Sequence, residues 1–180
     1  GCDVSCTSLA NEVRGFAENV TVRDVVSTYV YPNTLVLLRV TGARLKEAME
    51  NCASYFEMDE GGHVTVSEKF MKPKVSHYNF DYYSGVEYRF ELSNPVGSRV
   101  AELTRNGRPV KPDDVFTMCV NNYRATGVGG YDALRDCPHE REILTEMSEI
   151  LLDFFAANPL VTVDEASPYR VTYHGKPVLA

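Results

Sequence analysis

Apolar residues recur along this chain at two spacings, one typical of β-strands and the other of α-helices. Residues 34–41 and 115–120 are nearly continuous apolar runs of strand length, and residues 86–92 alternate strictly between apolar and polar positions. In residues 43–56 the apolar positions return every three or four residues, as on one face of an amphipathic helix. The same reasoning predicts further helices over residues 20–30 and 140–157, and strands over residues 2–6 and 169–173.

Capping and turn residues sharpen the ends of these elements. Thr21 is placed to cap the helix over residues 20–30, with Asp24 three positions later. Asn106 and Gly107 lie between two short apolar segments, where an Asn-Gly pair predicts a β-hairpin. Residues 57–77 contain a Gly-Gly pair, a proline and mixed charges with little periodicity, so we expect an irregular excursion without a function there.

Strands and helices interleave without the regular alternation that a doubly wound parallel sheet requires. The expected fold class is therefore α+β, with mixed sheets and packed helices. A chain of 180 residues that is 44% hydrophobic can bury one core, so we expect residues 1–180 to form a single domain. Because the sequence lacks an initiator Met and opens within a predicted strand, we interpret it as an excised piece of a longer protein.

Composition argues against two classes of partner. The formal net charge is −7, whereas a protein that binds a nucleic-acid polymer needs a surplus of Lys and Arg on one face. No apolar run approaches the roughly 20 residues of a membrane-spanning helix. A small anionic ligand is still compatible with a lone arginine such as Arg14, which precedes the first helix and is either a surface charge or an anion contact. The five cysteines are odd in number and contain no Cys-x-x-Cys pair, so we interpret most as buried apolar residues.

Two tyrosines, far apart in the sequence, lie next to amide side chains at predicted strand ends or turns. Tyr31 is followed by Asn33, and Tyr123 is preceded by Asn121 and Asn122. An aromatic face stacks on a nucleobase with about 1–3 kcal/mol, and an amide can bond to the edge of the base. Each tyrosine taken alone is better interpreted as a packing residue at a turn or strand end. Taken with the amides, the pair favours a site for a flat ring such as a nucleobase.

Groups for hydrolytic chemistry do not gather in this sequence. The four histidines are scattered, with no partner at metal-ligand spacing, which argues against a metal site in this chain. No serine lies in a nucleophile elbow, and no cysteine has an evident histidine partner. We interpret Asp113, Asp114 and Asp132 as turn or capping residues. The glycine-rich segment 127–130 lacks a Walker lysine, and we interpret it as a flexible wall beside Tyr123 rather than as a phosphate loop.

Five short segments, spread over nearly the whole chain, form an ordered set of motifs. They are Val-Arg-Gly-Phe (13–16), Tyr-Pro-Asn-Thr-Leu (31–35), Val-Thr-Gly-Ala-Arg-Leu-Lys-Glu (40–47), Tyr-Asn-Phe-Asp-Tyr-Tyr-Ser-Gly-Val (78–86) and Asn-Asn-Tyr-Arg-Ala-Thr-Gly (121–127). In this order they resemble the C-terminal domain of the 5′-nucleotidase family. The resemblance is strongest to its bacterial branch with 2′,3′-cyclic-nucleotide 2′-phosphodiesterase/3′-nucleotidase activity.

The resemblance implies a division of labour between two domains. In that family an N-terminal domain with two divalent metal ions hydrolyses the phosphate ester, while the C-terminal domain binds the nucleoside and swings it to the metals. This chain would then be the nucleotide-binding part, inactive alone and partnered by its own N-terminal metallophosphoesterase domain, which this sequence lacks. The parent protein would be a phosphoric ester hydrolase, and relatives lead us to expect an extracytoplasmic or cell-surface location.

Five residues take roles from their positions in these motifs. By resemblance, Tyr31 and Tyr123 fall where the family places the two aromatics that sandwich the base, and Asn33 falls where a side chain reaches the base edge. Arg14 matches the arginine near the substrate phosphate or ribose, and Gly85 matches a backbone position that lines the base pocket. Stacking on both faces accepts any base, so we expect weak base selectivity.

The chain departs from the family pattern at two places. Many relatives carry an aspartate for the ribose hydroxyls in the glycine loop, where residues 127–131 read Gly-Val-Gly-Gly-Tyr. Both stacking positions are tyrosine, whereas plain 5′-nucleotidases usually have phenylalanine, and this favours the cyclic-phosphodiesterase branch. The missing aspartate and catalytic half leave an alternative, a non-catalytic adhesion or scaffold module that keeps the fold without the ligand.

Overall fold

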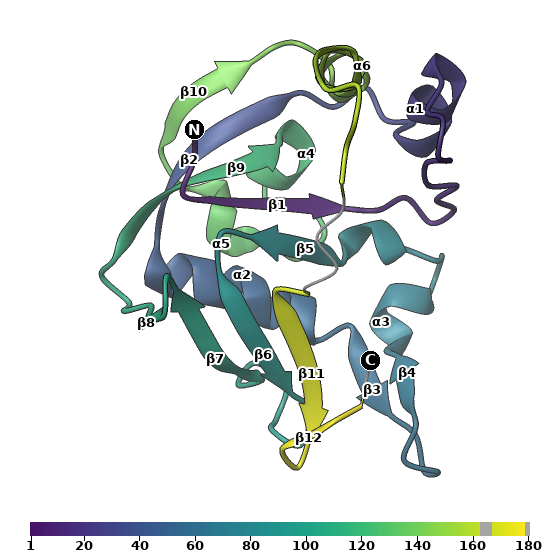
Figure 1. Ribbon diagram of the computed structural model, residues 1–180. Coiled ribbons are helices and arrows are strands. Elements are labelled where there is room, and N and C mark those ends of the chain that lie inside the picture. The colour runs from purple at the N-terminus through teal and green to yellow at the C-terminus, as the bar shows by residue number, and fades with distance from the viewer. Residues whose placement is uncertain (163–166, 179–180) are drawn as a thin grey trace.

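The computed structural model describes residues 1–162 and 167–178. Figure 1 shows its elements. In chain order they are β1 (Val4–Ser8), α1 (Val22–Thr28), β2 (Leu35–Thr41), α2 (Gly42–Ala53), β3 (Phe56–Met58), β4 (Val64–Val66), α3 (Glu68–Met71), the 3₁₀ helix η1 (His77–Asn79), β5 (Asp81–Ser84), β6 (Glu87–Glu91), β7 (Val100–Arg105), β8 (Arg108–Pro109), β9 (Val115–Asn121), α4 (Asn122–Ala125), α5 (Asp132–Arg135), β10 (His139–Ile143), α6 (Met147–Ala157), β11 (Tyr169–Tyr173) and β12 (Lys176–Pro177).

Two mixed sheets organise the domain. The first has the strand order β10-β2-β9-β1-β5, and the second has the order β12-β11-β6-β7-β8. In the first sheet β1 and β9 are parallel, while β2 is antiparallel to β9. In the second sheet β11 and β6 are parallel, while β6 and β7 are antiparallel. This arrangement, with helices packed on the sheets, confirms the predicted α+β class.

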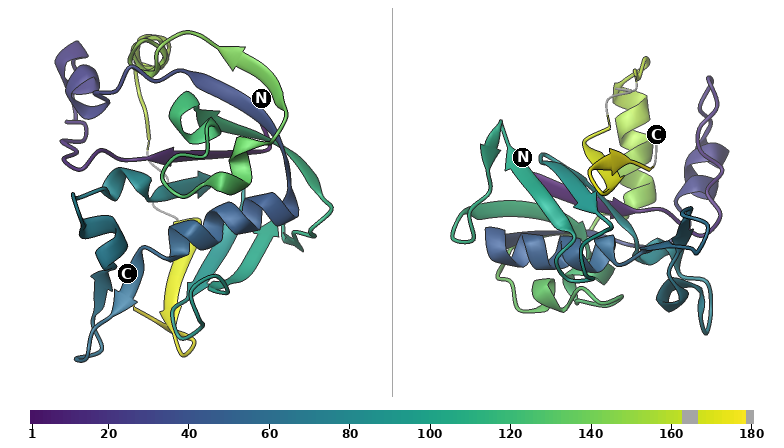
Figure 2. Two further views of the ribbon diagram at one scale, coloured as in Figure 1. Left: turned by 180° about the vertical axis from the view of Figure 1, so that it is seen from behind. Right: turned by 90° about the horizontal axis from the view of Figure 1, so that it is seen from below.

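One hydrophobic core joins the two sheets. Helix α2 contacts both β2 and β7, and its apolar face buries Leu45, Met49 and Cys52. On β2, Val36, Leu38 and Val40 are buried in the alternating pattern of a strand with one face on the core. Figure 1 and Figure 2 show α2 crossing the strands of the second sheet, well separated from α6.

The predicted helix cap and hairpin are both present. The Asp24 N–H donates to the Thr21 hydroxyl at 3.3 Å, and the Thr21 N–H donates to the Asp24 carboxylate at 2.8 Å, which is a capping box at the start of α1. Between β7 and β8, Asn106 and Gly107 have φ of 51° and 72°, the left-handed values of a two-residue hairpin turn. Local chemistry was therefore sufficient to place both features.

Residues 57–77 are not the irregular excursion that we expected. They include most of the β3–β4 hairpin, α3 and the start of η1. Phe70 of α3 is buried and packs edge-on against Tyr55, with ring centroids 5.1 Å apart, so the segment is anchored to the body of the domain. The prediction was wrong because two three-residue strands and a single helical turn are too short to show a period.

The helix predicted over residues 140–157 begins later than expected. Residues His139–Ile143 form β10 instead, which pairs antiparallel with β2. Helix α6 starts only at Met147, and none of its residues is fully buried. It contacts α1, and Phe155 packs edge-on against Phe16 with centroids 5.0 Å apart. Both helices lie at one end of the first sheet, away from the second sheet (Figure 1).

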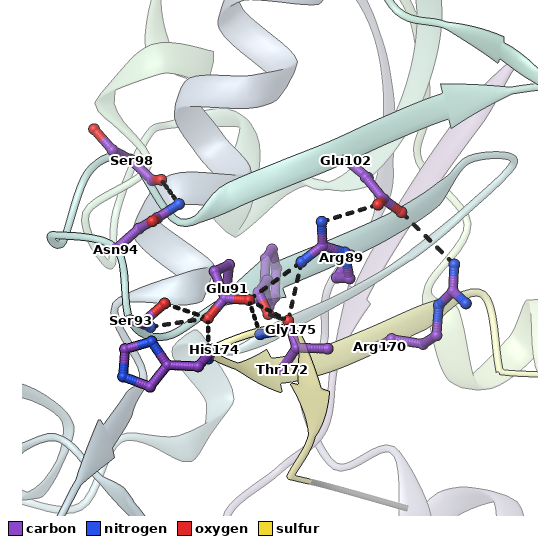
Figure 3. A network of polar contacts seen from close by, with 11 residues as sticks. Arg89, Glu91, Ser93, Asn94, Ser98, Glu102, Arg170, Thr172, His174 and Gly175 are labelled. Atoms are coloured by element: carbon purple, nitrogen blue, oxygen red, sulfur yellow. Dashed lines mark hydrogen bonds and ion pairs between the residues drawn. The ribbon is translucent and has the colours of Figure 1, made fainter.

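A buried carboxylate at the end of β6 links this strand to β11 and to the turn between β11 and β12 (Figure 3). Glu91, at the end of β6, accepts hydrogen bonds from the backbone N–H groups of Ser93 (3.1 Å), His174 (2.8 Å) and Gly175 (2.9 Å). The hydroxyl groups of Ser93 and Thr172 also donate to it, at 2.5 and 2.9 Å. Burial by itself would raise the pKa of Glu91, but these hydrogen bonds outweigh burial and lower the pKa to about 2.

Replacing Glu91 with Gln should destabilise the domain at neutral pH much more than in acid. A carboxyl group whose pKa is about 2 when folded and about 4.3 when unfolded stabilises the fold above pH 4.3, and this contribution is lost as the pH falls through 2. Hydrogen bonds to charged groups contribute about 1.5–3 kcal/mol, so urea unfolding at pH 7 should show a loss of that order. Glu102→Gln, at a half-exposed ion pair with Arg89, should change stability much less. An equal loss for Glu91→Gln at pH 7 and pH 2 would contradict this account.

Candidate functional site

One cavity, of about 350 Å³, gathers three of the five residues assigned from the motifs. Strands β1 and β9 are parallel, and β2 is antiparallel to β9. The C-terminal ends of β1 and β9 and the N-terminal end of β2 therefore meet at one end of the first sheet, and the cavity lies there. Its lining residues are Ser8, Tyr31, Asn33, Lys74, Tyr78, Asn121 and Tyr123.

Reciprocal hydrogen bonds hold the two tyrosine-bearing segments together. The Asn122 N–H donates to the Thr34 carbonyl at 2.9 Å, and the Thr34 N–H donates to Asn122 Oδ1 at 3.3 Å. Tyr31 is 42% exposed and Tyr123 is 36% exposed, so each ring keeps surface available to a ligand. The two tyrosine-bearing segments therefore lie together at a shared cavity.

Asn121 fixes the start of the short helix that carries Tyr123. Strand β9 ends at Asn121, whose Oδ1 accepts the Arg124 N–H at 2.7 Å and so caps α4. A backbone N–H can only donate, so the atom that faces it must be the amide oxygen. The Nδ2 group of Asn121 is then the end of the amide that is left for a ligand.

A buried ion pair lies beneath α4. Arg124 donates from Nε and Nη2 to the two carboxylate oxygens of Asp81 at 2.7 and 2.8 Å, and both residues are only 1% exposed. The guanidinium also donates to the carbonyl groups of Val128, at 2.7 Å, and Tyr78, at 3.2 Å. Burial raises the pKa of Asp81, and the Arg124 guanidinium opposes that rise. One cation thus supports both Tyr78 and the helix that bears Tyr123.

The glycine-rich segment 127–130 does not line the cavity, contrary to our expectation of a flexible wall beside Tyr123. Asn51 Nδ2 donates to the Gly129 carbonyl at 3.2 Å, and Arg124 holds the neighbouring Val128 carbonyl. The segment is therefore fixed between α2 and the buried ion pair. Its glycines serve close packing, since a Cβ on Gly129 would lie 2.2 Å from the Asn79 side chain.

Arg14 lies in the loop between β1 and α1 and is exposed rather than part of the cavity lining. The carbonyl of the adjacent Gly15 accepts a hydrogen bond from the Thr28 hydroxyl at 2.9 Å. This bond places the loop beside the end of α1 that leads to Tyr31. Arg14 thus lies in a loop that is hydrogen-bonded to the last residue of α1, the helix that precedes Tyr31.

Gly85 lies in the turn between β5 and β6 and is not among the lining residues. Ser8 of the cavity pairs with Asp81 at one end of β5, whereas Ser84 at the other end precedes Gly85. Gly85 has a φ of 87°, and a Cβ there would lie 2.2 Å from the Asp3 carbonyl oxygen. Steric contact with Asp3 therefore explains why a glycine is needed at this position, which does not line the cavity.

Sequence reasoning missed three lining residues, namely Ser8, Lys74 and Tyr78. Tyr78 begins one of the five motifs, but the resemblance assigns it no role, and Ser8 is the last residue of β1. Lys74 lies within residues 57–77, where the sequence predicts an irregular excursion without a function. The tertiary fold brings these residues to the same end of the first sheet as the tyrosines.

Comparison with protein families decides to which group the chain belongs. The family model described as the 5′-nucleotidase C-terminal domain matches residues 1–136. The chain is a member of this 5′-nucleotidase C-terminal domain family. The match confirms the family and fold that the five ordered motifs suggested.

Curated relatives of this family domain include nucleotide phosphoesterases. The chain is 34% identical over 133 residues to the 2′,3′-cyclic-nucleotide 2′-phosphodiesterase/3′-nucleotidase of Haemophilus influenzae. It is 27% identical over 154 residues to the trifunctional nucleotide phosphoesterase protein of Bacillus subtilis. The alignments cover 65% and 77% of this chain, but only 20% and 10% of the two relatives. The chain therefore spans about a fifth or less of their length.

Solved structures show the same family fold. A Staphylococcus aureus protein assigned to the 5′-nucleotidases, solved in complex with alpha-ketoglutarate, matches with a TM-score of 0.89 and 40% identity over 94% of this chain and 33% of its own. A 5′-nucleotidase precursor from Thermus thermophilus matches with a TM-score of 0.74 and 21% identity, over 95% of this chain and 32% of its own. The second likeness is one of fold alone.

Two features are not found in the part of the chain that the structure describes. Within residues 1–162 and 167–178, no group of three or more His, Cys, Asp or Glu side chains could hold a metal ion. These residues therefore do not fit a metal pair, and the roles proposed below involve none in this chain. None of the helices in these ranges is long and apolar enough to cross a membrane.

Proposed function

We propose that this domain binds nucleotides and nucleosides and presents their phosphate to a hydrolytic domain of the same protein. The observation that supports this most directly is the convergence of Tyr31 and Tyr123, from separate parts of the chain, on one cavity of about 350 Å³. That volume is within the usual range of small-molecule sites. The two rings offer stacking surfaces, and the amides of Asn33 and Asn121 can bond to the edge of a base.

Arg14 is the proposed contact for the phosphate or ribose. Its guanidinium is exposed, and a guanidinium donates two parallel hydrogen bonds that match a phosphate. The Thr28–Gly15 hydrogen bond keeps its loop beside the segment that leads to Tyr31. A nucleotide with its base in the cavity would then direct its phosphate toward the exposed side of this loop.

The parent protein, on this proposal, is an extracytoplasmic nucleotidase or cyclic phosphodiesterase. The named activities of the relatives support a hydrolase, and their greater length leaves room for a catalytic domain. Two divalent metal ions in that domain would supply the hydrolytic chemistry. This domain would contribute by orientation, since binding energy gained at the base holds the distant phosphorus in place for reaction.

Replacing either ring with alanine should weaken nucleoside binding about 5- to 150-fold, which corresponds to the 1–3 kcal/mol of one stacking contact. Adenosine and AMP can be titrated into the 180-residue chain and followed by NMR shifts, which report weak binding as well as tight binding. Tyr31→Phe and Tyr123→Phe are matched controls because they keep the stacking face, and they should bind nearly as the wild type does.

Two results would count against the proposal. Unchanged affinity in the Tyr31→Ala, Tyr123→Ala double variant would remove the stacking site. No saturable binding of any nucleoside or nucleotide by the wild type would favour the alternative, a non-catalytic adhesion or scaffold module that keeps only the fold.

A further inference from the structure

Two of the groups that line the cavity can act toward a ligand only as hydrogen-bond donors, and the described lining contains no carboxylate. Lys74 can only donate, since its ammonium group has no lone pair. The Asn121 amide also presents its Nδ2 donor, because its Oδ1 already accepts the Arg124 N–H. The edge of a bound base therefore meets hydrogen-bond donors and a positive charge.

Asn33 does not impose an opposite preference. Its Nδ2 lies 3.1 Å from the Tyr29 hydroxyl, which can either donate or accept. The Asn33 amide can therefore turn either end toward a ligand without losing this hydrogen bond. The charge of Lys74 and the capped amide of Asn121 are what distinguish one base edge from another.

The backbone that follows Lys74 is held in place by two hydrogen bonds. The Val75 carbonyl accepts a hydrogen bond from Asn11 Nδ2 at 3.0 Å, and the Ser76 N–H donates to the Phe70 carbonyl at 2.8 Å. These bonds attach the segment to α3 and to the loop after β1. The segment therefore reaches the cavity as part of the folded domain.

The Lys74 ammonium is near Tyr123 and is not neutralised. Burial and the nearby Tyr78 raise the pKa of Tyr123, while the charges of Arg124 and Lys74 oppose that rise. Lys72 pairs with Glu68, but Lys74 makes no ion pair with any carboxylate of the described ranges. Its charge is thus available to a ligand that enters beside Tyr123.

Nucleobases differ in what they present at such an edge. Guanine, hypoxanthine and uracil offer a carbonyl oxygen at the position where adenine and cytosine carry an amino group. A carbonyl oxygen accepts a charge-assisted hydrogen bond from an ammonium, which is stronger than a neutral one. An amino group would face the ammonium as donor against donor, and both groups would lose a partner.

We propose that Lys74, with the Asn121 amide, makes this cavity select nucleotides whose base is a 6-oxopurine or a 4-oxopyrimidine over those with an amino group at that position. The proposal rests on the nucleotide-binding function given above and replaces the weak base selectivity expected from stacking alone. Lys74 acts in it as a specificity-determining residue and takes no part in hydrolysis.

Inosine and adenosine provide the test, because they differ in the group at position 6 and carry no phosphate. Titrated into the 180-residue chain and followed by NMR, inosine should bind about 2- to 12-fold more tightly than adenosine, the factor for one net hydrogen bond. Lys74→Met should bring the ratio of the two affinities close to one, mainly by weakening inosine. Lys72→Met removes a surface lysine two positions away and should keep the wild-type ratio.

The outcomes separate this inference from the function on which it rests. No saturable binding of either nucleoside would overturn both. Binding of both with equal affinity by the wild type, or an unchanged ratio in Lys74→Met, would overturn the base preference and leave the nucleotide-binding function standing. A loss in Lys74→Met that appears with AMP and IMP but not with the nucleosides would assign Lys74 to the phosphate and overturn its role at the base edge.

Discussion

Arg124→Met should lower the free energy of unfolding by about 3–5 kcal/mol, because it leaves the buried Asp81 carboxylate without its partner. The guanidinium also donates to the carbonyl groups of Val128 and Tyr78, and these contacts would be lost as well. The measurement is urea unfolding at pH 7, followed by circular dichroism. Since the pair supports both Tyr78 and α4, nucleoside affinity should fall in the same variant.

Two further variants show whether the loss arises from the buried charge. Arg135→Met breaks an exposed ion pair with Asp132 and should change stability by less than about 1 kcal/mol. Removing both buried charges in Asp81→Leu, Arg124→Met should recover part of the loss, because no carboxylate is then left unpaired in the core. A single Arg124→Met variant as stable as Arg135→Met would contradict the structural role of the pair.

Gly85→Ala should destabilise the domain by about 2–5 kcal/mol. A left-handed backbone costs a residue with a Cβ about 1–2 kcal/mol, and forcing a methyl group into a filled space costs about 1–3 kcal/mol more. The atom in the way is the Asp3 carbonyl oxygen, 2.2 Å from the new Cβ. It cannot yield easily, because the Asp3 N–H is bonded to the Thr117 carbonyl at 2.8 Å.

Gly107→Ala is the matched control for this substitution. Gly107 also has a positive φ, of 72°, but a Cβ there meets nothing within 4 Å. Its variant should lose only the backbone contribution of about 1–2 kcal/mol, so the difference between the two variants in thermal or urea unfolding isolates the clash with Asp3. A Gly85→Ala variant that kept its stability but lost nucleoside affinity would instead support the position in the base pocket implied by the family motifs.

The sequence predicted those parts of the fold that depend on neighbours along the chain. The α1 cap needs only Thr21 and Asp24, and the β7–β8 hairpin needs only Asn106 and Gly107, so local chemistry determines both. The sequence also marks the two tyrosine segments, because an aromatic residue beside amide side chains is visible as a pattern. Tyr31 and Tyr123 share a cavity because of the strand order of the first sheet, and the sequence does not predict that strand order.

Other features could not be predicted because they depend on contacts between distant segments. Only Ile143 of β10 fits the apolar spacing that continues into α6, and the pairing of β10 with β2 is what shows that this segment is a strand. Lys74 reaches the cavity through bonds that involve Asn11 and Phe70, neither of which marks it in the sequence. The Arg124–Asp81 pair likewise joins two residues that nothing in the linear pattern connects.

Strand β11 covers the β6 edge of the second sheet, although the two strands lie far apart in the sequence. It adds in parallel to β6, yet it emerges from the ribosome long after β6, β7 and β8. The β6 edge therefore stays unpaired while the residues between β6 and β11 are synthesised, when open strand edges are prone to associate with other chains. A shortened chain that ends at residue 136, where the family match stops, would keep every cavity residue but leave that edge permanently open. Such a fragment should aggregate, whereas the full 180-residue chain carries the strand that closes the edge.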